Sequence, residues 1–259
     1  MLQRDLDAIN SWVDVNGMKL NATKTTMISF TKRKLPTNTE YLLNGVVLAK
    51  SPSCKYLGVT LTCNLTWNNH IVKTVSKAKR SLQFVMRNLK GGDPQTKEHA
   101  YKCLIRPLLE YCCGVWDPHT AIMKEQIDQV QRKAARYVVN NHRRWSKNKN
   151  RPHVSVSEEL KKLRWEPLST RRARVALRCL YKAVTCEPAW ECLDPFISLA
   201  SRIGRRDHHF KLEIKRYNTN VGLQSFLGRS VRLWNDIPLK NTKTLPCYLE
   251  FNRIMNLIV

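Results

Sequence analysis

The stretch WNNHIVKTVSKAKRSLQFVMRNL, residues 67–89, is the clearest structural signal in the chain. Its apolar residues recur at the spacing of one helix face, at Ile71, Val75, Ala78, Leu82 and Val85. Its cations fall on the remaining surface, at Lys73, Lys77, Lys79 and Arg80. The pattern predicts an amphipathic helix that packs with its apolar side. The basic side suits a groove that follows a phosphate backbone, and an ordinary solvated basic face would give the same pattern.

Helical periodicity continues on the C-terminal side of this segment. Gly91-Gly92-Asp93-Pro94 ends the first helix and begins the next. The apolar positions of the next two helices are Tyr101, Leu104, Ile105, Leu108 and Tyr111, and then Ile127, Val130, Ala134 and Val138. A kink is expected at Pro107, because proline lacks the N–H that an interior helical position needs. Two further helical patterns lie around Leu160 and Leu163 and from Pro167 to Val184.

The N-terminal side of the chain mixes helix and strand. A helical stripe over residues 2–13 ends at Asn16-Gly17, and residues 25–30 are β-branched and aromatic, as in a strand. Asn44-Gly45 stands between two short apolar runs, which is the strongest two-residue hairpin signal. A further strand is expected over residues 56–61. Together the patterns predict an α+β fold that is mostly α.

Changes in pattern divide the chain into four segments. Residues 1–65 hold the first helix and the β-hairpin, and residues 66–140 hold a helical bundle. The polar and basic residues 141–154 form a linker, and residues 155–259 form a C-terminal region that is helical and partly irregular.

The charge balance points to a polyanion as partner. Lys and Arg number 45 against 20 Asp and Glu, so the net charge is +25. Residues 1–31 are neutral, whereas residues 32–106 carry +11 and residues 129–182 carry +13. An excess of this size is an argument about binding partners and not about fold, and nucleic acid is the leading candidate. With only 9 glycines and 11 prolines, collagen-like and low-complexity chains are excluded.

Cysteine usage and hydropathy give weaker guidance. The 9 cysteines include no Cys-x-x-Cys pair and no zinc-binding spacing. We expect reduced cysteines that act as small core residues, as in a nuclear or cytoplasmic protein. We expect no bound metal. No apolar stretch is long enough to span a membrane, so an intracellular protein without a membrane partner is predicted.

Several short motifs, in this order, resemble one family. They are NGMKLN (16–21), LNG (43–45), KYLGV (55–59), RPLLEY (106–111), VWDP (115–118), QRKAAR (131–136) and WNDIP (234–238). The chain resembles the C-terminal part of the reverse transcriptase of an animal non-LTR (LINE-type) retrotransposon. The resemblance implies that residues 1–65 are the end of the polymerase palm with its primer-grip hairpin. It implies that residues 66–140 are the helical thumb.

The same resemblance implies a set of binding residues. Lys24 matches a lysine that lies near the phosphates of the incoming nucleotide, and Tyr56, Leu57 and Gly58 match the primer grip. An ordinary exposed lysine and a β-bulge are the alternatives for Lys24 and Gly58. We predict nucleic-acid contacts, to RNA, DNA or an RNA–DNA hybrid, from Lys73, Lys77, Lys79, Arg80, Arg132, Lys133, Arg136, Arg143 and Arg144. The aromatic residues Trp67, Tyr101 and Trp116 are expected in the core and not as stacking platforms.

The catalytic residues of the family are missing from this sequence. Nucleotidyl transfer of this type uses two magnesium ions held by carboxylates, and the family places two of these in an Asp-Asp pair. The nine aspartates here include no such pair. We therefore expect a truncated polymerase fragment that holds no magnesium, takes no small-molecule substrate, has no catalytic residue and keeps sequence-independent binding of template and primer.

Two other interpretations stay open at this point. The chain could be a self-contained basic helical protein that serves as a ribonucleoprotein scaffold without enzymatic activity. Alternatively, its N-terminal region could be unstable in isolation, because Trp12, Ile28 and Phe30 would then lack partner strands and be exposed.

Overall fold

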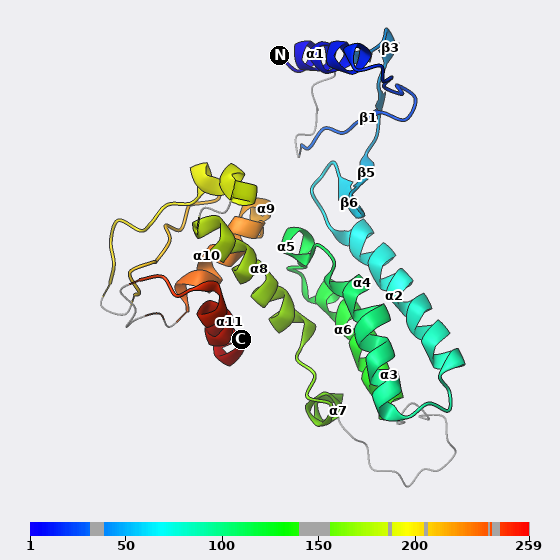
Figure 1. Cartoon of the computed structure of the whole chain (residues 1–259), viewed down its shortest axis with the longest axis vertical. Helices are drawn as coiled ribbons and strands as arrows, with labels where there is room; N and C mark the ends of the chain where they lie inside the picture. Colours follow the sequence, from blue (N-terminus) through cyan, green and yellow to red (C-terminus); the bar gives the residue numbers. More distant parts are fainter. Residues whose placement is uncertain are drawn as a thin grey trace. The chain divides into compact units, whose positions relative to one another are not determined.

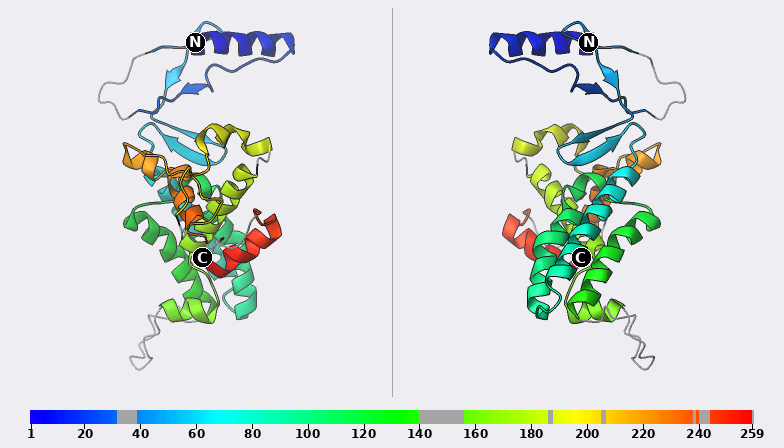
Figure 2. Two further views of the ribbon diagram at one scale, coloured as in Figure 1. Left: turned by 90° about the vertical axis from the view of Figure 1, so that its left-hand side faces the viewer. Right: turned by 90° about the vertical axis from the view of Figure 1, so that its right-hand side faces the viewer.

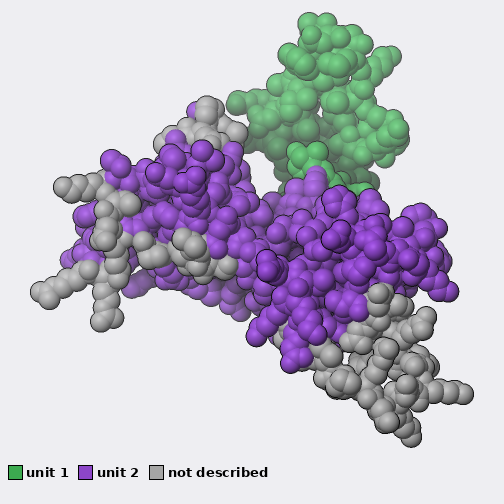
Figure 3. All heavy atoms as spheres, turned by 60° about the horizontal axis from the view of Figure 1, so that its bottom comes forward, with its two compact units in different colours: residues 1–72 green, residues 73–259 purple. Residues whose placement is uncertain are grey.

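The computed structural model describes residues 1–31, 39–139, 156–185, 188–204, 207–237, 239 and 244–258. The chain forms two compact units, residues 1–72 and residues 73–259, which Figure 3 colours separately. Helices dominate the described residues, and the strands are short (Figure 1). The predicted α+β, mostly α fold is therefore confirmed. The predicted linker, residues 141–154, lies outside the described residues.

The described residues of the first unit form one helix and three two-stranded sheets. Its elements are α1 (Leu2–Val15), β1 (Thr26–Met27), β2 (Leu42–Leu43), β3 (Val46–Val47), β4 (Ala49–Lys50), β5 (Ser53–Tyr56) and β6 (Val59–Thr62), followed by the first turn of α2 (Asn68–Asn88). β1 pairs with β4 in parallel, whereas β2–β3 and β5–β6 are antiparallel hairpins. The strand predicted over residues 25–30 is present only as the two residues of β1.

Helix α1 is attached to the first hairpin through one side chain. The Gln3 amide Nε2 donates to the carbonyl oxygen of Leu42 at 2.9 Å, and the Leu42 N–H donates to Gln3 Oε1 at 2.9 Å. The amide thus pairs with β2 as a neighbouring backbone would. Beside this contact, Val13 of α1 and Leu43 of β2 are buried. Trp12, in contrast, is 61% exposed.

Both hairpins reverse at two residues with positive φ. Asn44 and Gly45 have φ of 53° and 73°, which confirms the predicted hairpin. Leu57 and Gly58 have φ of 44° and 85°, so the chain turns back where a single strand over residues 56–61 was predicted. The predicted strand is therefore confirmed only in its second half, as part of β6, and its first half is interrupted by a turn in which glycine takes positive φ at little cost.

The second unit is a helical bundle followed by a smaller helical layer. Its elements after α2 are α3 (Pro94–Ala100), the π-helix η1 (Tyr101–Ile105), α4 (Arg106–Glu110), α5 (Cys113–Trp116), α6 (Ala121–Val138), α7 (Val156–Lys162), α8 (Leu168–Val184), the 3₁₀ helix η2 (Pro188–Phe196), α9 (Asn220–Leu223), α10 (Phe226–Asn235) and α11 (Tyr248–Ile258). Figures 1 and 2 show α2, α3 and α6 as neighbouring helices of one bundle. None of the described helices is both long enough and apolar enough to cross a bilayer.

The kink expected at Pro107 takes the form of a π-helical turn. The N–H of Arg106 bonds to the carbonyl of Tyr101, five residues earlier, where an α-helix would use a residue four earlier. Pro107 then stands in the first turn of α4, where its missing N–H is not needed. The helix stops before Cys112, which has a φ of 51°.

The C-terminal layer has its own core, made by α8, α10, α11 and the segment around Leu212. Trp234 is fully buried, and its Nε1 donates to the carbonyl of Phe210 at 2.8 Å. The amide of Asn235 pairs with the backbone of Leu212, accepting at 2.9 Å and donating at 2.9 Å. The WNDIP motif therefore has a structural role in packing.

The described cysteines are free thiols, and only some of them lie in the core. Cys113 is buried, and burial raises its pKa to about 12. Four others are exposed, namely Cys103, Cys112, Cys192 and Cys247. The expectation of a uniformly core-forming set is wrong for these four, because apolar neighbours in sequence do not place a residue on the packed side of its element.

Candidate nucleic-acid interface

Helix α2 packs with the side that its periodicity predicts. All five residues of the apolar stripe are buried, namely Ile71, Val75, Ala78, Leu82 and Val85. The segment contains no Pro or Gly and no acidic residue over its 21 positions. Its four predicted nucleic-acid contacts, Lys73, Lys77, Lys79 and Arg80, are all exposed. The helix therefore separates an apolar face from a cationic one.

The cations of α2 stand without acidic partners. In the part of the chain that the structure describes, no carboxylate forms an ion pair with Lys73, Lys77, Lys79 or Arg80. Arg87, in the last turn of α2, is likewise exposed and outside these pairs. Sequence reasoning missed Arg87, although it continues the same basic pattern. Exposed cations without partners are available to an external anion.

Contacts hold both ends of α2. In the first unit, the N–H of Thr60 donates to Nδ1 of His70 at 3.2 Å, which ties the first turn of the helix to β6. In the second unit, the hydroxyl of Tyr137 donates to the carbonyl of Leu89 at 2.6 Å, just beyond the last turn. Burial raises the pKa of Tyr137, so its hydroxyl stays protonated and able to donate. Within the second unit, the bond from Tyr137 thus ties the C-terminal end of the cationic helix to α6.

Helix α6 carries three of the predicted contacts, and two of them are paired. Arg132 bonds to Glu125, and this hydrogen bond holds the pKa of Glu125 below its usual value. Nε of Arg136 lies 3.9 Å from Oε2 of Glu159, whose side chain is buried. Lys133 is exposed. The predicted contacts Arg143 and Arg144 lie outside the described residues.

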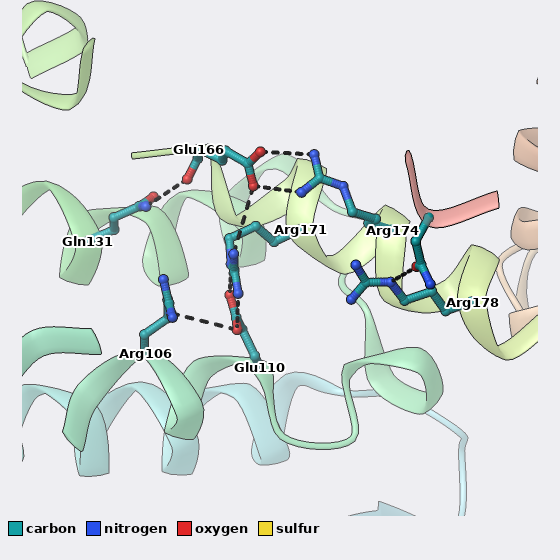
Figure 4. A network of polar contacts seen from close by, with 8 residues as sticks. Arg106, Glu110, Gln131, Glu166, Arg171, Arg174 and Arg178 are labelled. Atoms are coloured by element: carbon teal, nitrogen blue, oxygen red, sulfur yellow. Dashed lines mark hydrogen bonds and ion pairs between the residues drawn. The ribbon is translucent and has the colours of Figure 1, made fainter. Parts of the chain in front are cut away.

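The arginines of α8 are engaged within the protein. Figure 4 shows Arg171 and Glu110 pointing toward one another, with Arg171 Nη2 donating to Glu110 Oε2 at 3.0 Å. Arg174 binds Glu166 through two nitrogens, at 2.9 Å each. Glu166 also lies 3.8 Å from Arg171, and its backbone carbonyl accepts from Gln131 at 2.9 Å. This network joins α4, α6 and α8.

A second acidic residue joins the two helical layers. Asp117, from the VWDP motif, accepts from Nε of Arg172 at 2.6 Å and also binds Arg229 of α10. Arg172 is 1% exposed, so its charge is removed from water. Some of the basic residues within 129–182 therefore form ion pairs inside the protein and are not available to an external partner. Sequence reasoning missed this use, because the partners lie 55 and 112 residues apart.

The predicted sites of the first unit are exposed. Lys24 lies in a turn that is closed by Asn21 and precedes β1. Tyr56, Leu57 and Gly58 form the tip of the β5–β6 hairpin, where Leu57 is 72% exposed. The core assignment of Tyr101 and Trp116 is confirmed, since both are buried. Trp67 is only half-buried.

No metal centre is found among the described residues. Within residues 1–31, 39–139 and the later described ranges, no group of three or more His, Cys, Asp or Glu side chains is placed to hold a metal ion. The magnesium ions that the resemblance implies therefore have no fitting ligand set in this part of the chain.

Comparison with known proteins identifies two similar polymerases. The chain is 30% identical over 144 residues to the RNA-directed DNA polymerase from mobile element jockey of Drosophila funebris. It is 27% identical over 141 residues to the probable RNA-directed DNA polymerase from transposon BS of Drosophila melanogaster. Each match covers 53% of this chain, and 15% and 16%, respectively, of the relatives. No family model and no solved structure matches.

The two matches establish a relation over about half of the chain. The matched part is related to the RNA-directed DNA polymerases of non-LTR retrotransposons. The chain spans about one sixth of the length of these curated relatives.

Proposed function

We propose that this chain binds the phosphate backbone of RNA, DNA or an RNA–DNA hybrid through the cationic face of α2, without regard to base sequence. One observation carries the proposal. The five cations of α2 are exposed on a helix without acidic residues, and none of them belongs to an ion pair among the described residues. Arg171, Arg172 and Arg174 of α8, in contrast, are held by carboxylates inside the protein.

The proposed binding is electrostatic. Lysine and arginine contacts to phosphate oxygens position a nucleic acid but carry no direct information on its sequence. Each neutralised phosphate releases condensed counterions, so affinity falls as salt rises, with a log–log slope of about −0.9 per phosphate on duplex DNA. Because the contacts repeat along one helix, several neighbouring phosphates would be bound together.

The relation to retrotransposon polymerases supports a role in holding template and primer. In this proposal the chain is a polymerase fragment that keeps the nucleic-acid-binding part and lacks the catalytic carboxylates. The absence of an Asp-Asp pair from the sequence supports the proposal that the catalytic carboxylates are lacking. The chain by itself would then incorporate no nucleotide.

Fluorescence anisotropy with a labelled 20-base-pair duplex tests the binding. We expect salt-dependent binding by the wild type and a smaller salt slope for the triple variant Lys73→Ala, Lys77→Ala, Arg80→Ala, by about 0.9 for each lost contact. The matched control is the triple variant Lys124→Ala, Lys161→Ala, Lys162→Ala, which removes the same charge from exposed positions of α6 and α7. Equal losses in both variants would show that only net charge matters and would refute a binding face on α2.

A primer-extension assay tests the proposal that the chain by itself incorporates no nucleotide. Purified protein is given a primed RNA template, deoxynucleotides and magnesium. We expect no extended primer, whereas template-directed extension would refute the proposal that the chain lacks a polymerase centre.

A further inference from the structure

An aromatic side chain stands within the basic surface of α2. Phe84 is 58% exposed, although the neighbouring Leu82 and Val85 are buried. Lys73, Lys77, Arg80, Phe84 and Arg87 follow one another at steps of four, three, four and three residues. This spacing aligns them along one side of a helix. The Phe84 ring therefore shares one surface stripe with the cations.

The ring of Phe84 does not belong to the buried core of the second unit. Its backbone carbonyl accepts from the Asn88 amide at 2.8 Å, but the side chain points away from the apolar stripe. Among the described residues it neither stacks on another ring nor lies under a cation. A single exposed apolar residue needs no explanation by itself. Phe84 differs from such a residue because it lies between Arg80 and Arg87 on the same side of the helix. Both cations are within about 6 Å of it along the helix axis, so a ligand bound by them would also meet the ring.

We propose that Phe84 stacks on an unpaired base of a bound strand whose phosphates are held by Arg80 and Arg87. The inference rests on the proposed function and names its preferred ligand, a single strand or a single-stranded overhang. Proteins that bind single strands combine a cationic track with aromatic rings, because every base offers a face for stacking. In a blunt duplex the base faces are already stacked on one another, so the ring would gain little there.

The experiment compares the ligand preference of wild type and Phe84 variants. Binding of a 20-nucleotide single strand and of a blunt duplex of equal length is measured by anisotropy over a range of salt concentrations. We expect Phe84→Ala to weaken binding of the single strand by about tenfold and to leave duplex binding nearly unchanged. The salt slope should stay the same, because the ring carries no charge. Phe84→Trp should keep or increase affinity.

Two further measurements distinguish stacking on a base from a general apolar contact. A 2-aminopurine base in the single strand should lose fluorescence on binding to the wild type but not to Phe84→Ala. Phe84→Leu keeps an apolar side chain without a π-face and should behave like Phe84→Ala. The matched control is Ile122→Ala on α6, which removes another highly exposed apolar side chain outside the stripe. Thermal unfolding of all variants checks that the fold is intact.

The outcomes separate this inference from the function on which it rests. If the wild type binds neither ligand, the proposed function fails and the inference falls with it. If the wild type binds both with the expected salt slope but Phe84→Ala binds the single strand as well as the wild type does, only the inference is overturned. Normal binding by Phe84→Leu, or equal losses for both ligands, would also overturn stacking.

Discussion

The hydroxyl of Tyr137 donates to the carbonyl of Leu89 at 2.6 Å, across 48 residues of sequence. The same oxygen lies 3.4 Å from the carbonyl of Val85. The last carbonyls of an α-helix have no partner within the helix, and here a side chain of α6 supplies one. The bond ties the end of the basic helix α2 to the core of the bundle.

Removal of this hydroxyl should loosen the end of α2. Tyr137→Phe removes one of two donors to the carbonyl of Leu89, which also accepts from the N–H of Gly92 at 3.2 Å. We expect a loss of about 1 kcal/mol in the free energy of unfolding. Urea denaturation followed by circular dichroism measures the change. The control is Tyr56→Phe, whose hydroxyl belongs to an exposed side chain. Unchanged stability in Tyr137→Phe would show that the bond does not hold the helix.

A larger effect is expected at Asp117, which binds both Arg172 and Arg229. Asp117→Asn removes the negative charge and leaves the buried guanidinium of Arg172 unneutralised. Removing one partner of a buried ion pair lowers the free energy of unfolding by about 3 kcal/mol. The midpoint of urea denaturation should therefore fall clearly. Asp236→Asn, an exposed aspartate near the end of α10, is the matched control. Equal effects of both substitutions would contradict the role given to Asp117.

The sequence was sufficient to predict the elements that show strong periodicity. The helices α2, α6 and α8 each present an apolar stripe of several turns, so their positions could be predicted. The buried face was predicted fully for α2, whereas that of α8 also contains Arg172 and Arg174, which no apolar pattern indicates. The dipeptide Asn44-Gly45 was likewise sufficient to predict the β2–β3 hairpin. The turn at Leu57-Gly58 was missed because leucine is not a turn residue, and only the glycine beside it gave a signal.

The candidate site could be predicted only in part, for a physical reason. A count of charges does not distinguish an exposed lysine from an arginine that is neutralised by a distant carboxylate. Lys73 is free on the surface, whereas Arg172 meets Asp117 only through the tertiary fold. Phe84 was not singled out, because the exposure of one aromatic residue depends on which side of the helix is packed.

The ion pair between Glu166 and Arg174 predicts a dependence of stability on pH. The hydrogen bond from Arg174 is the main cause that lowers the pKa of Glu166 in the folded protein below its usual value. A lowered folded pKa means that the carboxylate stabilises the fold above the unfolded pKa and loses this contribution as pH falls through the folded pKa. The advantage of wild type over Glu166→Gln should therefore be present at pH 7 and vanish in strong acid.

Chemical denaturation of both proteins at several pH values between 3 and 7 measures this difference. Glu213→Gln provides the control, since Glu213 is exposed and lies outside the network of Figure 4. A stability difference between wild type and Glu166→Gln that does not change with pH would contradict the assignment.

The first unit should be the first part of the chain to be digested by a protease. Its strands are two to four residues long, and each sheet has only two of them, a size that is at best marginally stable alone. As expected for strands without partners, Trp12 and Phe30 are exposed, whereas Ile28 is half-buried. Regions with few buried apolar contacts open at low free energy. Limited digestion with chymotrypsin should therefore cut within residues 1–65 before it cuts within α2 to α6, and mass spectrometry of the fragments identifies the order. Early cuts inside α6, where Ile127, Val130 and Ala134 are fully packed, would show that the bundle is the less stable unit.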